Sequence, residues 1–227
     1  MTTYSSASAS LAARFAALQA ERERTWAPAQ LAANAGQRAG LIAAHNPAAH
    51  PAPGTDIAPF TLIQADGGTL TSAALLAGGP AVVVFFRFGG CPACNIALPY
   101  YEERLWPALK AAGIRLVAIS AQTPVDTGIV LRNGLTFPVT TDPDYTLARR
   151  LGITFFPEAQ PEIAPGADWI GATLGTHSWE MTQPAVLVLN ADGTLRHMAV
   201  SPDWLDRPEA ENILAHVPEV TGARAAA

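Results

Sequence analysis

The stretch AVVVFFRFGGCPACN, residues 81–95, constrains the fold of this chain more than any other segment. It opens with an unbroken apolar run that is rich in valine, which predicts a strand buried on both faces, as in a parallel sheet. Two glycines follow and permit a tight turn. Cys91 and Cys94, the only two cysteines in the chain, come next, and Pro92 between them suits the first position of a helix. The segment therefore predicts a strand, a turn and a helix with two thiols at the junction.

The rest of the chain alternates between strand-like and helix-like patterns. We expect strands or hairpins over 60–70, 81–86, 114–120 and 184–200, and helices over 96–113, 127–134, 143–153 and 207–217. Pro107 is expected to kink or end the first of these helices. The alternation predicts an α/β fold whose central mixed sheet has a parallel part and an antiparallel edge, with helices on both faces.

The N-terminal region has a different composition. Leu11, Phe15 and Leu18 recur at helical spacing, and Pro28 is placed to open a second helix. Residues 45–56 concentrate Pro and Gly, which is typical of a linker or an ordered extended crossing. We therefore predict a helical arm and linker over 1–56, one domain over 57–220 and a flexible tail over 221–227. An arm of this kind either docks on the body of its own chain or pairs two protomers in a homodimer.

Charge and hydropathy exclude several classes of partner. The formal net charge is −5 and no basic stripe is present, so nucleic acid is not an expected partner. The N-terminus lacks a positive region before an apolar core, and Arg14 interrupts its apolar stretch, which argues against a secretory signal. The longest apolar run falls far short of the roughly 20 residues that span a bilayer. We expect a cytoplasmic protein with no membrane partner.

The spacing of the two cysteines favours redox chemistry over a structural role. A disulfide between Cys91 and Cys94 would close almost no loop and would add little stability. A zinc site needs two further ligands, and the five histidines are scattered singly, so neither a metal nor another cofactor is expected. At a helix start, by contrast, backbone N–H groups and the helix dipole favour a thiolate. The pair is therefore predicted to be catalytic.

Five segments carry a resemblance to a known family. They are VVVFFRFGGCPACN at 82–95, IRLVAISAQTP at 114–124, LTFPVTTDPDYTLARRLGI at 135–153, SWEMTQPAVLVLNADGTLR at 178–196 and VSPDWLDRPEAENIL at 200–214. Together they resemble the peroxiredoxin-like branch of the alkyl hydroperoxide reductase and thiol-specific antioxidant (AhpC/TSA) family. The resemblance covers most of the chain. It implies a thioredoxin-like three-layer sandwich with a central mixed sheet, preceded by the helical arm.

The chain departs from the family pattern at the site itself. Ordinary peroxiredoxins carry Pro-x-x-x-Thr-x-x-Cys, and the overlay puts Arg87 in the place of Pro, Cys91 in the place of Thr and Cys94 in the place of the peroxidatic cysteine. The arginine that usually assists peroxide cleavage falls on Pro184. That proline instead matches the cis-proline that faces the cysteine pair in thioredoxin. The resemblance therefore predicts a cis bond before Pro184, in contact with the two sulfurs.

Three further residues are candidates for supporting roles. Arg87 is either a solvated charge at a strand end or a cation that lowers the pKa of a neighbouring thiol. Gly90 stands where the branch often has an aromatic residue, which leaves the thiols less shielded, while the simpler explanation for the glycine is that it permits the tight turn. Trp179, in the Ser-Trp-Glu element, is placed near Pro184 by the resemblance, while packing is the simpler explanation for it.

Three functions are compatible with these features. The first is a thiol peroxidase that reduces hydroperoxides through a thiol–disulfide cycle and is regenerated by an external thiol, either a thioredoxin-like protein or a low-molecular-weight thiol. The second is a thiol–disulfide oxidoreductase without peroxide chemistry. The third is a non-enzymatic binding protein that keeps the thioredoxin fold. The position of Cys91 at the helix boundary favours it as an exposed nucleophile with Cys94 as its buried resolver, whereas the peroxiredoxin register assigns the attack to Cys94.

Overall fold

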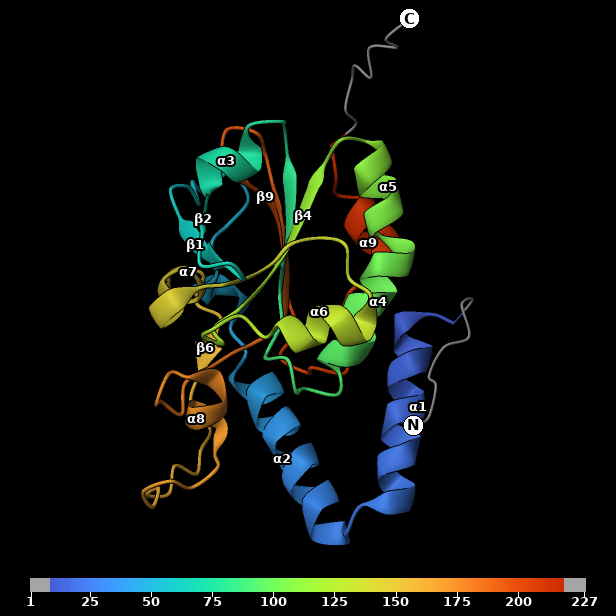
Figure 1. Cartoon of the computed structure of the whole chain (residues 1–227). Helices are drawn as coiled ribbons and strands as arrows, with labels where there is room; N and C mark the ends of the chain where they lie inside the picture. The colour runs from blue at the N-terminus through green and yellow to red at the C-terminus, as the bar shows by residue number, and fades with distance from the viewer. Residues whose placement is uncertain (1–8, 219–227) are drawn as a thin grey trace, which may run out of the picture.

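In the computed structural model, which describes residues 9–218, a seven-stranded mixed sheet forms the centre of the molecule (Figure 1). Its order is β2-β1-β5-β4-β3-β8-β9. The strands are β1 (Thr61–Gln64), β2 (Thr69–Thr71), β3 (Ala81–Phe85), β4 (Arg115–Ser120), β5 (Val139–Thr141), β8 (Ala185–Leu189) and β9 (Leu195–Val200). Strands β3, β4 and β5 run parallel, and the remaining pairs are antiparallel. The predicted mixed sheet, with its parallel part and antiparallel margin, is confirmed.

Helices cover both faces of this sheet. One face packs against α3 (Ser72–Leu76) and α7 (Thr146–Arg150), and the other against α1 (Leu11–Thr25), α4 (Cys94–Arg104), α5 (Trp106–Ala111), α6 (Thr127–Asn133) and α9 (Ala210–Leu214). Side chains of β3 alternate between the two cores: Val82 and Val84 join the α4 side, and Val83 and Phe85 the α3 side. Every residue of β3 is buried, as expected for a central strand. The result is the predicted three-layer α/β sandwich.

The observed elements differ from the sequence prediction in detail. The helix expected over 96–113 is interrupted at Leu105, and Pro107 lies in the first turn of α5, where its missing N–H costs no hydrogen bond. The expected helix over 207–217 is limited to α9, and the one over 143–153 consists of a 3₁₀ turn (Pro143–Tyr145) followed by α7. The structure adds a 3₁₀ turn (Pro47–Ala49), α8 (Ile170–Leu174) and a small separate sheet of β6 (Thr154–Phe155) and β7 (Met181–Thr182).

The N-terminal arm consists of two helices that are attached to the body in different ways. In α1, Leu11, Phe15 and Leu18 are buried and belong to the same core cluster as both cysteines. This apolar stripe docks on its own chain and is not left free to pair two protomers. Helix α2 (Pro28–Ala44), which Pro28 opens as predicted, contains no fully buried residue. The tail predicted over 221–227 lies outside the described residues.

The carboxylate of Glu209 holds the start of α1 from a distant part of the chain. It accepts hydrogen bonds from the backbone N–H groups of Leu11 and Ala12, both at 2.9 Å, and from the hydroxyl of Tyr100. These N–H groups belong to the first turn of the helix, where no partner within the helix exists and where the helix dipole favours an anion. Glu209 therefore links α1 to α4 and to the loop that enters α9.

We expect Glu209→Gln to lower the free energy of unfolding by about 1–2 kcal/mol, because the amide keeps one acceptor but loses the charge. Burial acts to raise the pKa of Glu209, but the bonds from Tyr100, Ala12 and Leu11 hold it below its ordinary value. The wild-type advantage is therefore complete at neutral pH and is lost as the pH falls through that lowered pKa. Urea unfolding at pH 7 and pH 3 tests this. Glu211→Gln is the control, since its carboxylate is mostly exposed and its removal should cost less than about 0.5 kcal/mol.

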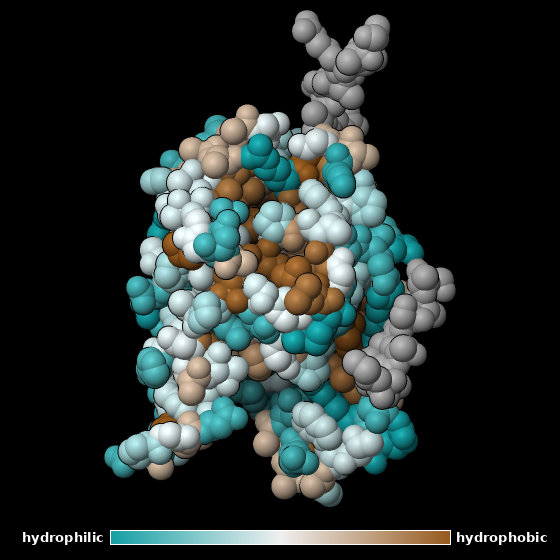
Figure 2. Space-filling view, in the orientation of Figure 1, coloured by the Kyte–Doolittle hydropathy of each residue, from teal (hydrophilic) through white to brown (hydrophobic). Residues whose placement is uncertain are grey.

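One face of the molecule exposes apolar surface near α6. Figure 2 shows apolar side chains gathered over this face, and Leu131 of α6 is 81% exposed. Arg132, the next residue of α6, donates a hydrogen bond to the backbone oxygen of Gly89 at 3.0 Å, so this helix flanks the cysteine turn.

Within residues 9–218, no helix combines the length and hydropathy that crossing a bilayer requires.

Candidate active site

The turn that carries the cysteines is fixed by close backbone packing and by one amide side chain. At Gly89 a Cβ would stand 1.7 Å from a carboxylate oxygen of Asp126, so a larger residue there would displace the Asp126 side chain. The side-chain amide of Asn95 donates to the backbone oxygens of Gly89 at 2.7 Å and Cys91 at 2.9 Å. These contacts place the two thiols beyond the carboxyl end of β3, the end of a strand at which α/β proteins commonly bind their ligands.

The helix begins later than predicted. The oxygen of Cys91 accepts hydrogen bonds from the N–H groups of Cys94 and Asn95, both at 3.0 Å, and the regular pattern of α4 starts at Cys94. Pro92 therefore lies in the turn before the helix, and its predicted place as the first helical residue is wrong. The structure leaves the side chain of Pro92 and the backbone of Gly90 exposed at the surface of this turn.

Both thiols are buried. Cys91 is 3% exposed and Cys94 is fully inaccessible, so the prediction of an exposed Cys91 is wrong. The reason is that α1 docks on this face of the sheet. The cysteine side chains join the core that contains Phe15 of α1 and Phe86 after β3. They are also close enough to each other for the thiol of Cys91 to donate a hydrogen bond to the sulfur of Cys94.

The sulfur of Cys94 is surrounded by hydrogen-bond donors. It accepts the backbone N–H of Arg87 and a guanidinium N–H (Nη2) of Arg207, each at 3.4 Å. Burial by itself disfavours a charged sulfur, but the Cys91 hydrogen bond, the charge of Arg207 and the two N–H donors together hold the pKa of Cys94 well below its ordinary value. Donation of its hydrogen bond and burial raise the pKa of Cys91 well above the ordinary value. The geometry therefore favours a Cys94 thiolate beside a Cys91 thiol.

Arg207 is the site residue that the sequence reasoning missed. It lies in the loop between β9 and α9, is 7% exposed, and its Nε donates to the backbone oxygen of Trp204 at 3.0 Å. Its guanidinium carbon lies 5.7 Å from the ring centre of Phe15. One signal was present: Arg207 heads the region predicted to be helical, and a cation at a helix N-terminus is disfavoured by the dipole. A residue in such an unfavourable position is a candidate for an interaction with a part of the protein outside the helix.

Arg87 is not a solvated charge at a strand end. Its guanidinium carbon lies 4.3 Å from the ring centre of Trp204 and 5.9 Å from that of Phe155. Burial lowers the pKa of Arg87, while the two cysteines act to raise it. Among residues 9–218, neither Arg87 nor Arg207 forms an ion pair with a carboxylate. Two guanidinium groups therefore stand at the cysteine pair without acidic partners.

Pro184 does not have the predicted geometry. Within the described chain the cis peptide bonds are Ala58–Pro59 and Thr123–Pro124, so the expected cis bond before Pro184 is wrong. The backbone here runs straight into the sheet: the oxygen of Pro184 accepts the N–H of Ser201 at 2.8 Å, which extends the β8–β9 ladder by one bond. As the residue just before β8, the proline removes no ladder hydrogen bond.

Trp179 is packed against another tryptophan. Its ring centre lies 4.8 Å from that of Trp169, and the ring planes are tilted by 57°. The adjacent Glu180 is buried and forms a two-pronged ion pair with Arg149, whose Nε lies 3.0 Å from one carboxylate oxygen. These contacts support a packing role for Trp179. Its place in substrate binding stays a prediction.

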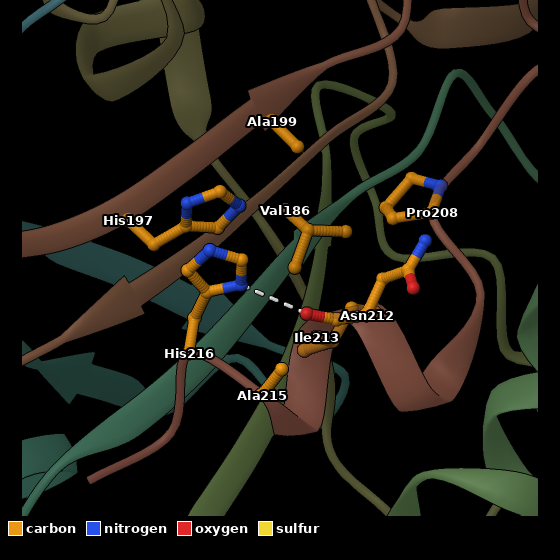
Figure 3. Close-up of a pocket in the computed structure, with 8 residues that line it drawn as sticks. All are labelled: Val186, His197, Ala199, Pro208, Asn212, Ile213, Ala215 and His216. Carbon is orange, nitrogen blue, oxygen red and sulfur yellow. Dashed lines mark hydrogen bonds between the residues drawn. The ribbon is translucent and has the colours of Figure 1, made fainter.

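A larger pocket lies apart from the sulfurs. It has a volume of about 320 Å³ and is lined by Val186, His197, Ala199, Pro208, Asn212, Ile213, Ala215 and His216 (Figure 3). The rings of His197 and His216 stack there with centres 3.6 Å apart. Within residues 9–218 no group of three or more His, Cys, Asp or Glu side chains is arranged to hold a metal ion.

Comparisons with known proteins identify the family of the chain and agree with its fold. A sequence model of the AhpC/TSA family matches residues 53–198. The fold is similar to that of peroxidoxin BcpB from Mycobacterium tuberculosis, with a TM-score of 0.55 and 19% identity over 74% of this chain and 96% of that one. It is also similar to a mutant of peroxiredoxin 6 from Arenicola marina, with a TM-score of 0.54 and 18% identity over 70% and 68% of the two chains. No curated protein sequence matched.

Proposed function

The chain belongs to the AhpC/TSA family, and from this membership we propose that it is a thiol-dependent oxidoreductase that reduces hydroperoxides through a cycle of Cys94 and Cys91. The observation that carries the proposal is the environment of the Cys94 sulfur, which accepts hydrogen bonds from Arg207 and from the backbone of Arg87. A thiolate is the reactive form of cysteine, and fixed donors maintain it at neutral pH.

The cycle has three steps. The Cys94 thiolate attacks the terminal oxygen of a hydroperoxide, the O–O bond breaks, and the departing alkoxide takes a proton to leave as an alcohol, while Cys94 becomes a sulfenic acid. The Cys91 sulfur then attacks the oxidised sulfur, the S–O bond breaks, and water leaves with the Cys91 proton. Two equivalents of an external thiol reduce the resulting disulfide and are themselves oxidised to a disulfide.

Arg207 stabilises the charge at both ends of the first step. Its guanidinium favours the thiolate before attack and is near enough to the sulfur to donate to an oxygen bound there. In the family overlay, the arginine that assists peroxide cleavage falls on Pro184 and is therefore missing. Arg207 supplies a positive charge in its place. Cys91 already donates to the Cys94 sulfur, so the resolving group stands next to the sulfenic acid when that acid forms.

The second candidate is a thiol–disulfide oxidoreductase without peroxide chemistry. The observation that favours it is the contact between the two thiols, which suits disulfide exchange as well as it suits resolution of a sulfenic acid. Its other support, a cis-proline facing the cysteines, is removed by the geometry at Pro184. The peroxidase reading therefore ranks first.

Two assays run side by side separate the candidates. Peroxide consumption with dithiothreitol as reductant should proceed with the wild-type protein and fail with Cys94→Ser. Reduction of insulin disulfides under the same conditions should be slow, because both sulfurs are buried and a protein disulfide must reach them. Insulin reduction without peroxide consumption would favour the second candidate. Inactivity in both assays would leave only a binding function.

The pair should also form a reversible disulfide. We expect a reduction potential between about −270 and −120 mV for Cys91–Cys94, the range of oxidoreductases with the same spacing. Equilibration in glutathione buffers, followed by alkylation of the remaining thiols and mass measurement, gives this value. If no intramolecular disulfide forms even under strong oxidant, the cycle proposed above is wrong.

A further inference from the structure

The guanidinium of Arg87 is held by apolar and sulfur contacts and not by acceptors that would neutralise it. It lies against the ring of Trp204, and its Nη2 is 3.3 Å from the sulfur of Met181 in β7. Its Nε is buried and has no hydrogen-bond partner within residues 9–218. Contacts of this kind fix the position of a cation and leave its charge uncompensated.

A second unpartnered polar atom lies in the same region. The N–H of Gln183 donates to the oxygen of Ile153, so the extended backbone of β7 continues through Gln183. In extended backbone alternate residues share a side, which puts Gln183 on the side of Met181, the residue that Arg87 contacts. The Oε1 atom of Gln183 is buried and also lacks a partner in the described chain. The protein therefore leaves one donor, on Arg87, and one acceptor, on Gln183, unused on two neighbouring segments.

The charges at the site do not balance. Arg87 and Arg207 contribute two positive charges, and a single Cys94 thiolate contributes one negative charge. The thiolate accepts from the side chain of Arg207 but only from the backbone of Arg87. The guanidinium of Arg87 is therefore the unneutralised cation, and a partly buried cation gains most from an anionic partner. Arg87 is a partly exposed residue, whereas both sulfurs and Arg207 are buried.

We propose that Arg87 binds an anionic group of the substrate, a carboxylate, while the substrate reacts at Cys94. The inference rests on the proposed function and specifies its substrate class: hydroperoxides or small disulfides that carry a carboxylate. The planar guanidinium matches a carboxylate in shape and charge. Phe155, which is partly exposed and lies beside the Arg87 guanidinium, supplies an apolar surface for the part of the substrate between the carboxylate and the reacting atoms.

The test compares two reagents on one thiol. In the Cys91→Ser background, the rate of reaction of reduced Cys94 with dianionic dithiobis(nitrobenzoate) is divided by its rate with neutral dithiodipyridine. The ratio removes any effect of a variant on the pKa of Cys94, because both reagents need the same thiolate. Arg87→Met should lower this ratio at least about tenfold, the effect of one unit charge near contact distance in a partly screened site.

Two variants serve as controls. Arg87→Lys keeps the charge and should keep most of the ratio. Arg104→Met removes an arginine of α4 that is paired with Glu211 at the surface, and it should leave the ratio unchanged. A second experiment tests hydroperoxides in place of disulfides. The wild-type protein should consume a fatty-acid hydroperoxide, which carries a carboxylate, faster than the methyl ester of the same hydroperoxide. Arg87→Met should consume the two at equal rates.

The outcomes separate this inference from the proposed function. An unchanged reagent ratio in Arg87→Met, with Cys94 still reactive toward the neutral reagent, overturns the anion site and leaves the thiolate mechanism intact. A Cys94 that reacts with neither reagent in the parent protein overturns the proposed function and the anion site together. A ratio that falls equally in Arg104→Met overturns the assignment to Arg87, since the effect would then come from net charge alone.

Discussion

Cys94→Ser should abolish the reaction of the protein with hydroperoxide and with iodoacetamide near neutral pH, lowering the rate by more than about a thousandfold. The reason is that this sulfur alone accepts the N–H groups of Arg87 and Arg207, while Cys91 keeps its proton. Cys91→Ser should still react once. A serine hydroxyl can donate to the Cys94 sulfur as the thiol does, so the thiolate survives.

Trapping experiments test this assignment directly. With one equivalent of hydroperoxide, the Cys91→Ser protein should stop at a sulfenic acid that dimedone labels on Cys94, and it should not turn over. The wild-type protein should yield a disulfide and no lasting dimedone adduct. Rapid alkylation of Cys91 at neutral pH in the Cys94→Ser protein would reverse the roles and restore the assignment that the sequence alone favours.

The second large effect is expected from Arg207→Met. Methionine keeps an apolar stem against Phe15 and removes the charge that stabilises the thiolate, so the pKa of Cys94 should rise. Below the new pKa the thiolate fraction falls tenfold per unit. At a pH below both pKa values, alkylation of Cys94 should therefore slow by about 10–100-fold, while at a pH above both pKa values the rate should be nearly that of the wild type.

The pH dependence distinguishes an electrostatic role of Arg207 from a merely structural one. A structural defect would lower the rate at every pH, whereas loss of the charge moves the midpoint of the alkylation profile to higher pH. Arg207→Lys should recover part of the shift. Arg104→Met, at the surface of α4, should leave the midpoint in place. A midpoint that does not move in Arg207→Met would show that the thiolate is stabilised elsewhere.

The sequence predicted the parts of this fold that have strong local patterns. The run of valines in β3 and the β-branched character of β4 identified central strands, and Pro107 marked the end of α4. The short strands β5, β6 and β7 were not foreseen, because two or three residues show no periodicity. Strands β6 and β7 pair across some 25 residues of chain, through a contact that only the folded state defines.

The site was predicted to a similar extent. Spacing identified Cys91 and Cys94, and the overlay brought Arg87 beside them. The exposure of Cys91 was predicted wrongly because local sequence does not show that α1 covers this face. Arg207 was missed because it is separated from Cys94 by more than a hundred residues of chain. Only the conformation of the loop after β9 brings its guanidinium to the sulfur. Local patterns pointed to the pair of cysteines, and the contacts of the folded chain are the reason to propose Cys94 as the attacking sulfur.

Helix α1 and the loop before α9 pack near Cys94, and the residues that they contribute are not the ones that identify the family of the chain. The family match spans 53–198 and therefore includes both cysteines and Arg87. Phe15, Arg207 and Glu209 fall outside it, at opposite ends of the chain, yet they contact one another's elements in the structure. A fragment trimmed to the matched boundaries would retain two thiols of ordinary reactivity and lose the cation that activates one of them. The proposed reactivity of Cys94 therefore depends on residues from both ends of the chain, which must fold onto the matched region together.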